Sequence, residues 1–202
     1  MIKAVIFDFG NVICYFTNQK LVDRIAKISG RSSQDIFNRL YRQTNITKDY
    51  ETGLISSLEF YEKILALCQI DVSPLEFKEI YTKDKFSPVE GTKDLIEKLK
   101  NNYKIGILSN TSQWDWDEAM VTAPFIVDVD ATTLSYQVGA MKPDTKIFTD
   151  MLAKLSLKPE ECVFTDDIEE YVIAAKTLGF QAFRFTTAEK LMDDLRGVGI
   201  KI

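Results

Sequence analysis

The sequence predicts an α/β fold in which helices cover both faces of a parallel β-sheet and a helical module is inserted after the first strand. Short segments rich in β-branched and aromatic residues, each bounded by turn residues, are typical of buried strands. Helical patterns alternate with these segments in the second half of the chain, which indicates parallel strands joined by helical crossovers. The predicted strands are Ala4–Phe9, Lys104–Ser109, Phe125–Val129, Cys162–Thr165 and Ala182–Phe185.

Three segments between these strands carry the apolar spacing of amphipathic helices. They are Thr92–Lys100, Asp144–Leu155 and Ile168–Leu178, and each places its large apolar side chains on one face. Gly179 stands directly after the third segment, where a glycine commonly ends a helix. We therefore expect a three-layer core of helices, sheet and helices.

The stretch from Phe16 to Phe86 has helical patterns throughout and no convincing strand. Its roughly 70 residues far exceed the dozen or so that an ordinary crossover needs. We therefore expect residues 16–86 to form a separate helical module over the sheet, with residues 1–15 and 87–202 forming the core.

Composition excludes several classes of partner. The net charge of −5 and the pI near 5.0 do not fit the basic face of a nucleic-acid-binding protein, and no apolar run approaches the ~18 residues of a membrane span. Asp8 interrupts the apolar start, which predicts a strand and not a signal peptide. The three widely spaced cysteines predict no disulfide framework and favour a reducing cytoplasm. Monomer and homodimer both remain open.

The chain contains no histidine. A Ser-His-Asp triad, a Cys-His pair and a zinc site built on histidine are therefore excluded. An enzyme of this composition is expected to use a carboxylate or a metal-bound water as nucleophile. The oxygen ligands that remain favour Mg²⁺ over zinc.

Polar residues gather where the predicted strands end. Because ligands of open α/β sheets bind outside the carboxyl ends of the strands, these residues are expected to meet at one edge. They are Asp8 after the first strand, Ser109-Asn110-Thr111 at the second, Asp166-Asp167 after the fourth, and Lys142 before a helix.

This set of side chains suits phosphoryl transfer. Adjacent carboxylates repel one another unless a cation neutralises them, so Asp8, Asp166 and Asp167 predict a Mg²⁺ site. Ser109 and Lys142 are expected to hold the phosphate oxygens while Asp8 attacks phosphorus and forms an aspartyl-phosphate that water hydrolyses.

Four segments of the chain, in the same order and spacing, resemble the motifs of the haloacid dehalogenase superfamily. They are Asp8-Phe9-Gly10-Asn11-Val12, Ile107-Leu108-Ser109-Asn110-Thr111, Gly139-Ala140-Met141-Lys142-Pro143-Asp144 and Phe164-Thr165-Asp166-Asp167. The resemblance spans nearly the whole chain and implies a Rossmann-like core with an inserted α-helical type-one cap. The residues of the first two motifs most resemble those of the branch that contains α-glucose-1-phosphate phosphatases.

The resemblance assigns roles to individual positions. Asp8 corresponds to the nucleophile and a metal ligand, and Gly10 to a residue whose backbone carbonyl binds the metal. Asp167 matches the direct magnesium ligand, and Asp166 the residue that binds the ion through water or orients Lys142. Ser109 and Lys142 match the phosphate-holding positions, with Asn110 beside them. The implied activity is Mg²⁺-dependent hydrolysis of a small phosphorylated metabolite, such as a sugar phosphate, beneath a cap that excludes polymers.

Two positions depart from the family pattern. Family phosphatases usually carry a second Asp, the general acid and base, two residues after the nucleophile, and here that position is Gly10. General acid–base help is typically worth ~10²–10⁴-fold in rate, so its loss favours good leaving groups or an acid supplied from the cap or the substrate. The second departure is Tyr171, where related sequences often have Asn.

Gly10 keeps two other functions open. A 2-haloacid dehalogenase uses the same Asp nucleophile on carbon without a metal, although Asp166 and Asp167 add negative charge that disfavours a carboxylate substrate. A weakened member of the family could instead bind phosphate compounds or a protein partner without turnover. Retention of Asp8, Lys142 and both acidic residues of the fourth motif argues against that reading.

Overall fold

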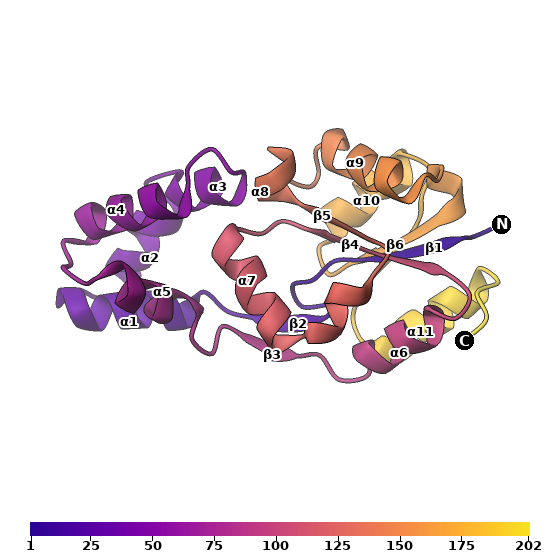
Figure 1. The fold of residues 1–202 in the computed structure, drawn as a ribbon, viewed down its shortest axis with the longest axis horizontal. Coiled ribbons are helices and arrows are strands. Elements are labelled where there is room, and N and C mark those ends of the chain that lie inside the picture. The colour runs from indigo at the N-terminus through magenta and orange to yellow at the C-terminus, as the bar shows by residue number, and fades with distance from the viewer.

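The core of the molecule is a five-stranded parallel sheet whose central strand is the first one in the chain. The computed structural model describes residues 1–202 (Figure 1). From one edge of the sheet to the other, the strands are β5 (Ala131–Leu134), β4 (Lys104–Ser109), β1 (Ala4–Phe7), β6 (Cys162–Asp166) and β7 (Gln181–Arg184). All four neighbouring pairs are parallel, as the alternation of strands and helices predicts.

Side chains of β1 alternate between two apolar layers, because successive residues of a strand point to opposite faces. Val5 and Phe7 belong to the cluster that includes residues of α6 (Thr92–Leu99) and α11 (Ala188–Gly197). Ala4 and Ile6 belong to the cluster that includes residues of α9 (Thr145–Leu155) and α10 (Glu169–Thr177). The two pairs of helices lie on opposite sides of the sheet in Figure 1, so the three-layer α/β core is confirmed.

Five helices of the insert extend beyond one end of the sheet (Figure 1). They have an apolar core of their own, in which Tyr50 stacks on Phe60 with ring centroids 4.3 Å apart. Trp114 of the α/β core packs against this cluster from outside. The helices are α1 (Gln19–Ser29), α2 (Ser33–Tyr41), α3 (Ile46–Glu51), α4 (Ser57–Cys68) and α5 (Pro74–Thr82).

The two connections between cap and core pair with each other. They form an antiparallel ribbon of β2 (Cys14–Phe16) and β3 (Phe86–Pro88), two short strands that the sequence patterns did not indicate. The two connections to the helical insert are therefore hydrogen-bonded to each other where they lie side by side.

The predicted strand at Phe125–Val129 is wrong. The segment Pro124–Asp128 forms a 3₁₀ helix, η1, and the strand follows at Ala131–Leu134. Proline at the first position fixes a helical φ and has no N–H to contribute to a sheet. Within η1, Ile126 is buried while Val127 is exposed, so the apolar run packs on one side only.

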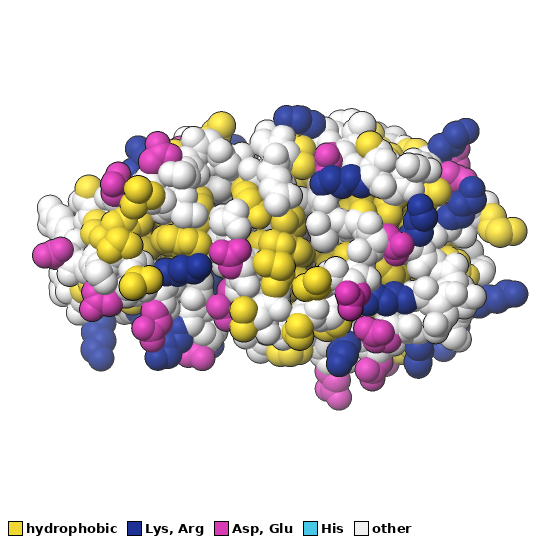
Figure 2. Space-filling view, viewed as in Figure 1, with side chains coloured by type: hydrophobic (Ala, Val, Ile, Leu, Met, Phe, Trp, Pro, Cys, Tyr) yellow, Lys and Arg dark blue, Asp and Glu magenta, His cyan; other side chains and the backbone are white.

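The remaining elements connect these layers: α7 (Gln113–Thr122), α8 (Ser135–Val138) and η2 (Pro159–Glu161). All three cysteines are free and buried. None of the helices is both long enough and apolar enough to cross a lipid bilayer. The face shown in Figure 2 intersperses basic and acidic side chains, with apolar patches over the insert and the middle of the molecule.

Candidate active site

Asp8 lies immediately beyond the carboxyl end of the central strand. Phe7 pairs with Ile107 on one side and Thr165 on the other, so the next residue stands level with Asp166. The Asp8 N–H donates to the carbonyl of Thr165 at 2.9 Å, and the Asp8 side chain is buried. The predicted strand Ala4–Phe9 overran the sheet by two residues, because the chain turns at Phe9, whose carbonyl accepts from the N–H groups of the following turn.

Lys142 is buried between two carboxylates. Its Nζ lies 2.8 Å from Asp8 Oδ1 and 2.6 Å from Asp166 Oδ2, and it donates to the carbonyl of Leu108 at 3.1 Å. These three acceptors match the three donors of an ammonium group. Burial opposes the charge, but the two carboxylates outweigh it and raise the pKa of Lys142. The lysine is therefore a fixed cation beside Asp8.

Three carboxylates meet at this point, as the strand ends predict. Oxygens of Asp8, Asp166 and Asp167 all lie within 4.8 Å of one another. Burial raises the pKa of Asp8 to about 7; Lys142 opposes this rise and Asp166 adds to it. One lysine does not balance this much negative charge, so the cluster has the donor set and the charge that a hard divalent cation requires.

The two acidic residues after β6 have different surroundings. Asp166 is fully buried: one oxygen accepts from Lys142 and the other from the Ile168 N–H at 2.9 Å. Asp167 is half-buried, and one of its oxygens accepts from Asn11 Nδ2 at 3.0 Å. Asp166 thus holds the lysine in place, while Asp167 keeps an oxygen free of protein partners.

Ser109 and Asn110 end the neighbouring strand β4 and line the same cavity as Asp8. The Ser109 hydroxyl is directed at no protein acceptor. Both ends of the Asn110 amide engage the backbone of Lys142: Nδ2 donates to its carbonyl at 3.1 Å and Oδ1 accepts from its N–H at 2.7 Å. The Asn110 side chain therefore positions Lys142, and its predicted role in binding phosphate stays a prediction.

Gly10 lines the cavity beneath the ring of Phe16. A Cβ atom at position 10 would lie 3.0 Å from Phe16 Cε1, which is tighter than ordinary contact. A side chain at this position would therefore need the ring of Phe16 to shift by a few tenths of an ångström. Tyr171 also lines the cavity: its hydroxyl accepts from Asn110 at 3.4 Å, and its ring centroid is 5.2 Å from Lys142 Nζ.

The cavity, of about 230 Å³, reaches from Asp8 to residues that the sequence analysis did not select. Glu51 is the last residue of α3, Lys85 lies between α5 and β3, and Asp115 lies in α7. These residues are scattered in sequence and belong to no motif. No local sequence pattern marks Glu51 or Lys85 as a site residue, because one ends a helix and the other lies in a connection. Only the fold brings them together.

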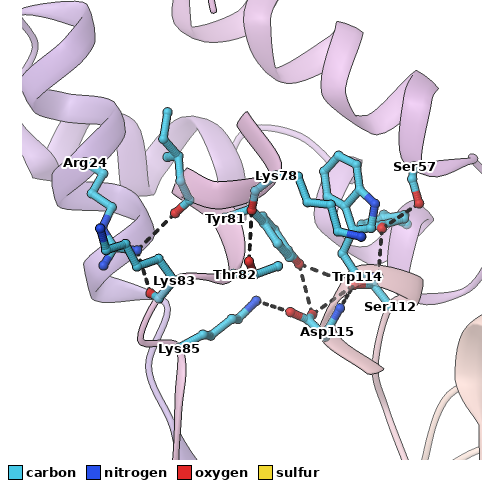
Figure 3. Close-up of polar contacts among 12 residues, drawn as sticks. Arg24, Ser57, Lys78, Tyr81, Thr82, Lys83, Lys85, Ser112, Trp114 and Asp115 are labelled. Carbon is cyan, nitrogen blue, oxygen red and sulfur yellow. Dashed lines mark hydrogen bonds and ion pairs between the residues drawn. The ribbon is translucent and has the colours of Figure 1, made fainter. Parts of the chain in front are cut away.

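Lys85 and Asp115 form a buried ion pair at the junction of cap and core (Figure 3). The second Asp115 oxygen accepts from the Tyr81 hydroxyl at 2.9 Å and from the Ser112 hydroxyl at 2.9 Å. Lys85 Nζ also lies 3.9 Å from the centroid of the Tyr81 ring. Both charges are therefore paired and hydrogen-bonded, and the pair forms a polar part of the wall of the cavity that Asp8 also lines.

Fold and site together are those of a hydrolase. The family model of haloacid dehalogenase-like hydrolases matches residues 2–179, and the chain belongs to this family.

Two similar proteins come from Bacteroides thetaiotaomicron. D-ribitol-5-phosphate phosphatase is 32% identical over 191 residues, which cover 91% of this chain and 92% of the relative. The solved structure of a HAD family enzyme in complex with magnesium and inorganic phosphate is 25% identical, covers 93% of this chain and 96% of its own, and has a TM-score of 0.83. The L-2-haloacid dehalogenase of Xanthobacter autotrophicus shares the fold at 20% identity, with a TM-score of 0.64 and coverage of 100% of this chain and 85% of its own.

Proposed function

We propose that this hydrolase is a Mg²⁺-dependent phosphatase of small phosphate esters, with sugar or polyol phosphates as its substrate class. The observation that carries the proposal is the meeting of Asp8, Lys142 and the acidic pair Asp166-Asp167 at the carboxyl ends of the strands. The similarity to a D-ribitol-5-phosphate phosphatase over nearly the whole chain supports the substrate class.

The substrate phosphate is bound by the residues around Asp8. Mg²⁺ would be held by Asp8, Asp167 and the backbone carbonyl of Gly10. Asp166 would bind the ion through water or orient Lys142. The bound ion supplies positive charge that neutralises the phosphate oxygens and the carboxylates around it. Lys142 and the Ser109 hydroxyl hold further phosphate oxygens as charge moves during the reaction.

Asp8 is the nucleophile in this proposal. An Asp8 oxygen attacks phosphorus, the bond from phosphorus to the alcohol oxygen breaks, and the phosphoryl group is transferred to Asp8. Water then attacks the same phosphorus, which releases phosphate and restores the carboxylate. Asp166 keeps Lys142 charged and in position through both steps.

The size of the cavity and the cap set the substrate class. We divide the chain into a core of residues 1–15 and 87–202 and a cap of residues 16–86, which covers the site. A cavity of about 230 Å³ accommodates a phosphate with a short polar alcohol and leaves no room for a polymer. The wall of Lys85 and Asp115 offers charged groups to the hydroxyls of such an alcohol.

Phosphate release from a panel of sugar phosphates, polyol phosphates, nucleotides and acetyl phosphate tests the proposal. Assays with Mg²⁺ and with EDTA are run on the natural protein and on Asp8→Asn, which removes the nucleophile and keeps the shape. We expect Mg²⁺-dependent release concentrated in a few small esters and at most a few per cent of it in the variant. Chloride release from 2-chloropropionate without metal, with no phosphate release from the panel, would overturn the proposal.

A further inference from the structure

The proposed reaction lacks an obvious proton donor for the departing alcohol. Position 10 is a glycine, which has no side chain to donate a proton, and the ring of Phe16 lies beside it. Lys142 donates to two carboxylates and a carbonyl, and the carboxylates stabilise its charged form, so it holds its protons tightly. A donor must therefore come from another part of the cavity wall.

We infer that Glu51, at the end of cap helix α3, is the general acid and base of this active site. The inference rests on the proposed phosphatase activity and deepens it. Glu51 lines the same cavity as Asp8, Ser109 and Lys142, and it comes from the helical insert, not from the sheet.

The backbone of Glu51 is anchored, through one side chain, to the loop that follows Ser109. Its carbonyl lies 2.5 Å from the Ser135 hydroxyl, and the same hydroxyl accepts from the Thr111 N–H at 2.8 Å. Thr111 stands two residues after Ser109. One serine thus links the end of the cap helix to the loop that is expected to hold the phosphate.

Gly53 shows how closely this part of the cap approaches the core. Its φ is +69°, and a Cβ atom at this position would lie 2.1 Å from the backbone oxygen of Tyr136. Only glycine allows both this conformation and this contact. The chain that follows Glu51 therefore lies directly on α8, which fixes where the Glu51 side chain begins.

The carboxyl group of Glu51 is not committed to another structural role. It forms no hydrogen bond and no ion pair with the protein, whereas Asp115, its neighbour in the wall, accepts from three side chains. It also lies outside the group of three carboxylates that could share a metal ion, which consists of Asp8, Asp166 and Asp167. Glu51 is thus a half-buried acid that faces the cavity and has no partner there.

The charges around Glu51 suit proton exchange near neutral pH. Burial raises the pKa of Glu51 to about 7, the negative charge of Asp115 adds to the rise, and Lys85 opposes it. The other titratable groups that face it are the hydroxyls of Tyr41 and Tyr81, whose own pKa values burial raises. A carboxyl with such a pKa gives up and takes back a proton at little cost.

The two steps balance with Glu51 as the proton carrier. When the Asp8 oxygen bonds to phosphorus and the ester P–O bond breaks, the alcohol oxygen takes the proton of the Glu51 carboxyl. In the second step the Glu51 carboxylate takes a proton from water, the water oxygen bonds to phosphorus, and the bond between phosphorus and Asp8 breaks. Glu51 is then protonated again for the next cycle.

Glu51→Gln tests the inference with two esters that differ in leaving group. The first is D-ribitol 5-phosphate, or the alkyl phosphate that the natural protein turns over fastest in the panel, and the second is 4-nitrophenyl phosphate. We expect the kcat for the alkyl ester to fall by about 10²–10⁴-fold, because an alkoxide leaves poorly without a proton. Nitrophenolate needs no proton, so the aryl ester should give a burst of about one equivalent followed by slow turnover, since the second step has lost its base.

Two further variants keep the test interpretable. Glu62→Gln removes an exposed glutamate of the same cap and should behave as the natural protein. Glu51→Ala with added formate supplies a free carboxylic acid to the cavity, and partial recovery of alkyl-ester turnover is expected. Acid-quenched Glu51→Gln should carry phosphate on Asp8 in its peptide mass spectrum, which a merely structural loss does not produce.

The outcomes separate this inference from the proposed function. An active natural protein whose Glu51→Gln variant shows no burst with the aryl ester, or changes only KM, would overturn the inference and leave the phosphatase standing. A variant that retains alkyl-ester turnover would do the same. Absence of Mg²⁺-dependent release from the natural protein would overturn the proposed function, and the inference with it.

Discussion

Lys142→Met is predicted to destabilise the metal-free protein strongly and in a pH-dependent way. The ammonium lies 2.8 Å from Asp8 and 2.6 Å from Asp166, and each attraction is worth about 6 kcal/mol at an effective dielectric constant of about 20. Desolvation of the three buried groups offsets most of this gain. Removal of one partner leaves the others unpaired, at a net cost of about 3–5 kcal/mol.

Urea denaturation at pH 8 and pH 5, in EDTA and in Mg²⁺, measures this cost. We expect the deficit of about 3–5 kcal/mol at pH 8 in EDTA and a smaller one at pH 5, where the raised pKa of Asp8 lets that carboxyl take up a proton in the folded protein. Mg²⁺ should stabilise the variant more than the natural protein, because more negative charge is uncompensated. Lys93→Met, which removes an exposed lysine, is the control and should change the stability by less than about 0.5 kcal/mol.

A Lys142→Met protein as stable as the natural one in EDTA at pH 8 would refute this reasoning. It would mean that the two carboxylates are not both charged beside the lysine. The assignment of Lys142 as a fixed cation would then fall.

Three further perturbations probe the rest of the site. Asp167→Ala should weaken Mg²⁺ binding in a calorimetric titration at least tenfold, and unchanged binding would show that the ion lies elsewhere. Asp115→Ala should lower the free energy of unfolding by about 3–5 kcal/mol, because it leaves Lys85 buried and unpaired; a loss below 1 kcal/mol in urea would contradict this. For Glu51, whose pKa is raised from 4.5 to about 7, the associated stability is fully present below pH 4.5 and is lost as the pH rises to 7. Between pH 5 and pH 8, the free energy of unfolding should therefore fall less for Glu51→Gln than for the natural protein, by up to about 3 kcal/mol. Equal pH profiles of the two proteins would contradict the raised pKa of Glu51.

Residues at strand ends were accessible to sequence analysis because the strands themselves are recognisable. Ala4–Phe7 and Cys162–Asp166 are short, buried and apolar, and each runs directly into its acidic residues. The order of strands in the sheet then brings Asp8 beside Asp166 without further assumptions. Lys142 was found only through its place in the third motif, since nothing in the local sequence indicates burial.

Elements without an apolar signal were missed or misplaced. The edge strand Ala131–Leu134 contains two threonines, which favour strands but lower the hydropathy, while the more apolar Pro124–Asp128 forms a helical turn. The wall formed by Glu51, Lys85 and Asp115 depends on how the cap sits on the core. Such contacts join residues that are 30 or more positions apart, and no local pattern encodes them.

The central claim is that Asp8 attacks phosphorus, and trapping the intermediate tests it most directly. The protein is quenched in acid during turnover of its best substrate with Mg²⁺, treated with borohydride, which reduces an acyl phosphate to an alcohol, and analysed by peptide mass spectrometry. We predict a mass change confined to residue 8 that is absent without substrate and absent in EDTA. Rapid phosphate release with Asp8 unmodified at every quench time, in a protein whose Asp8→Asn variant stays active, would contradict the account.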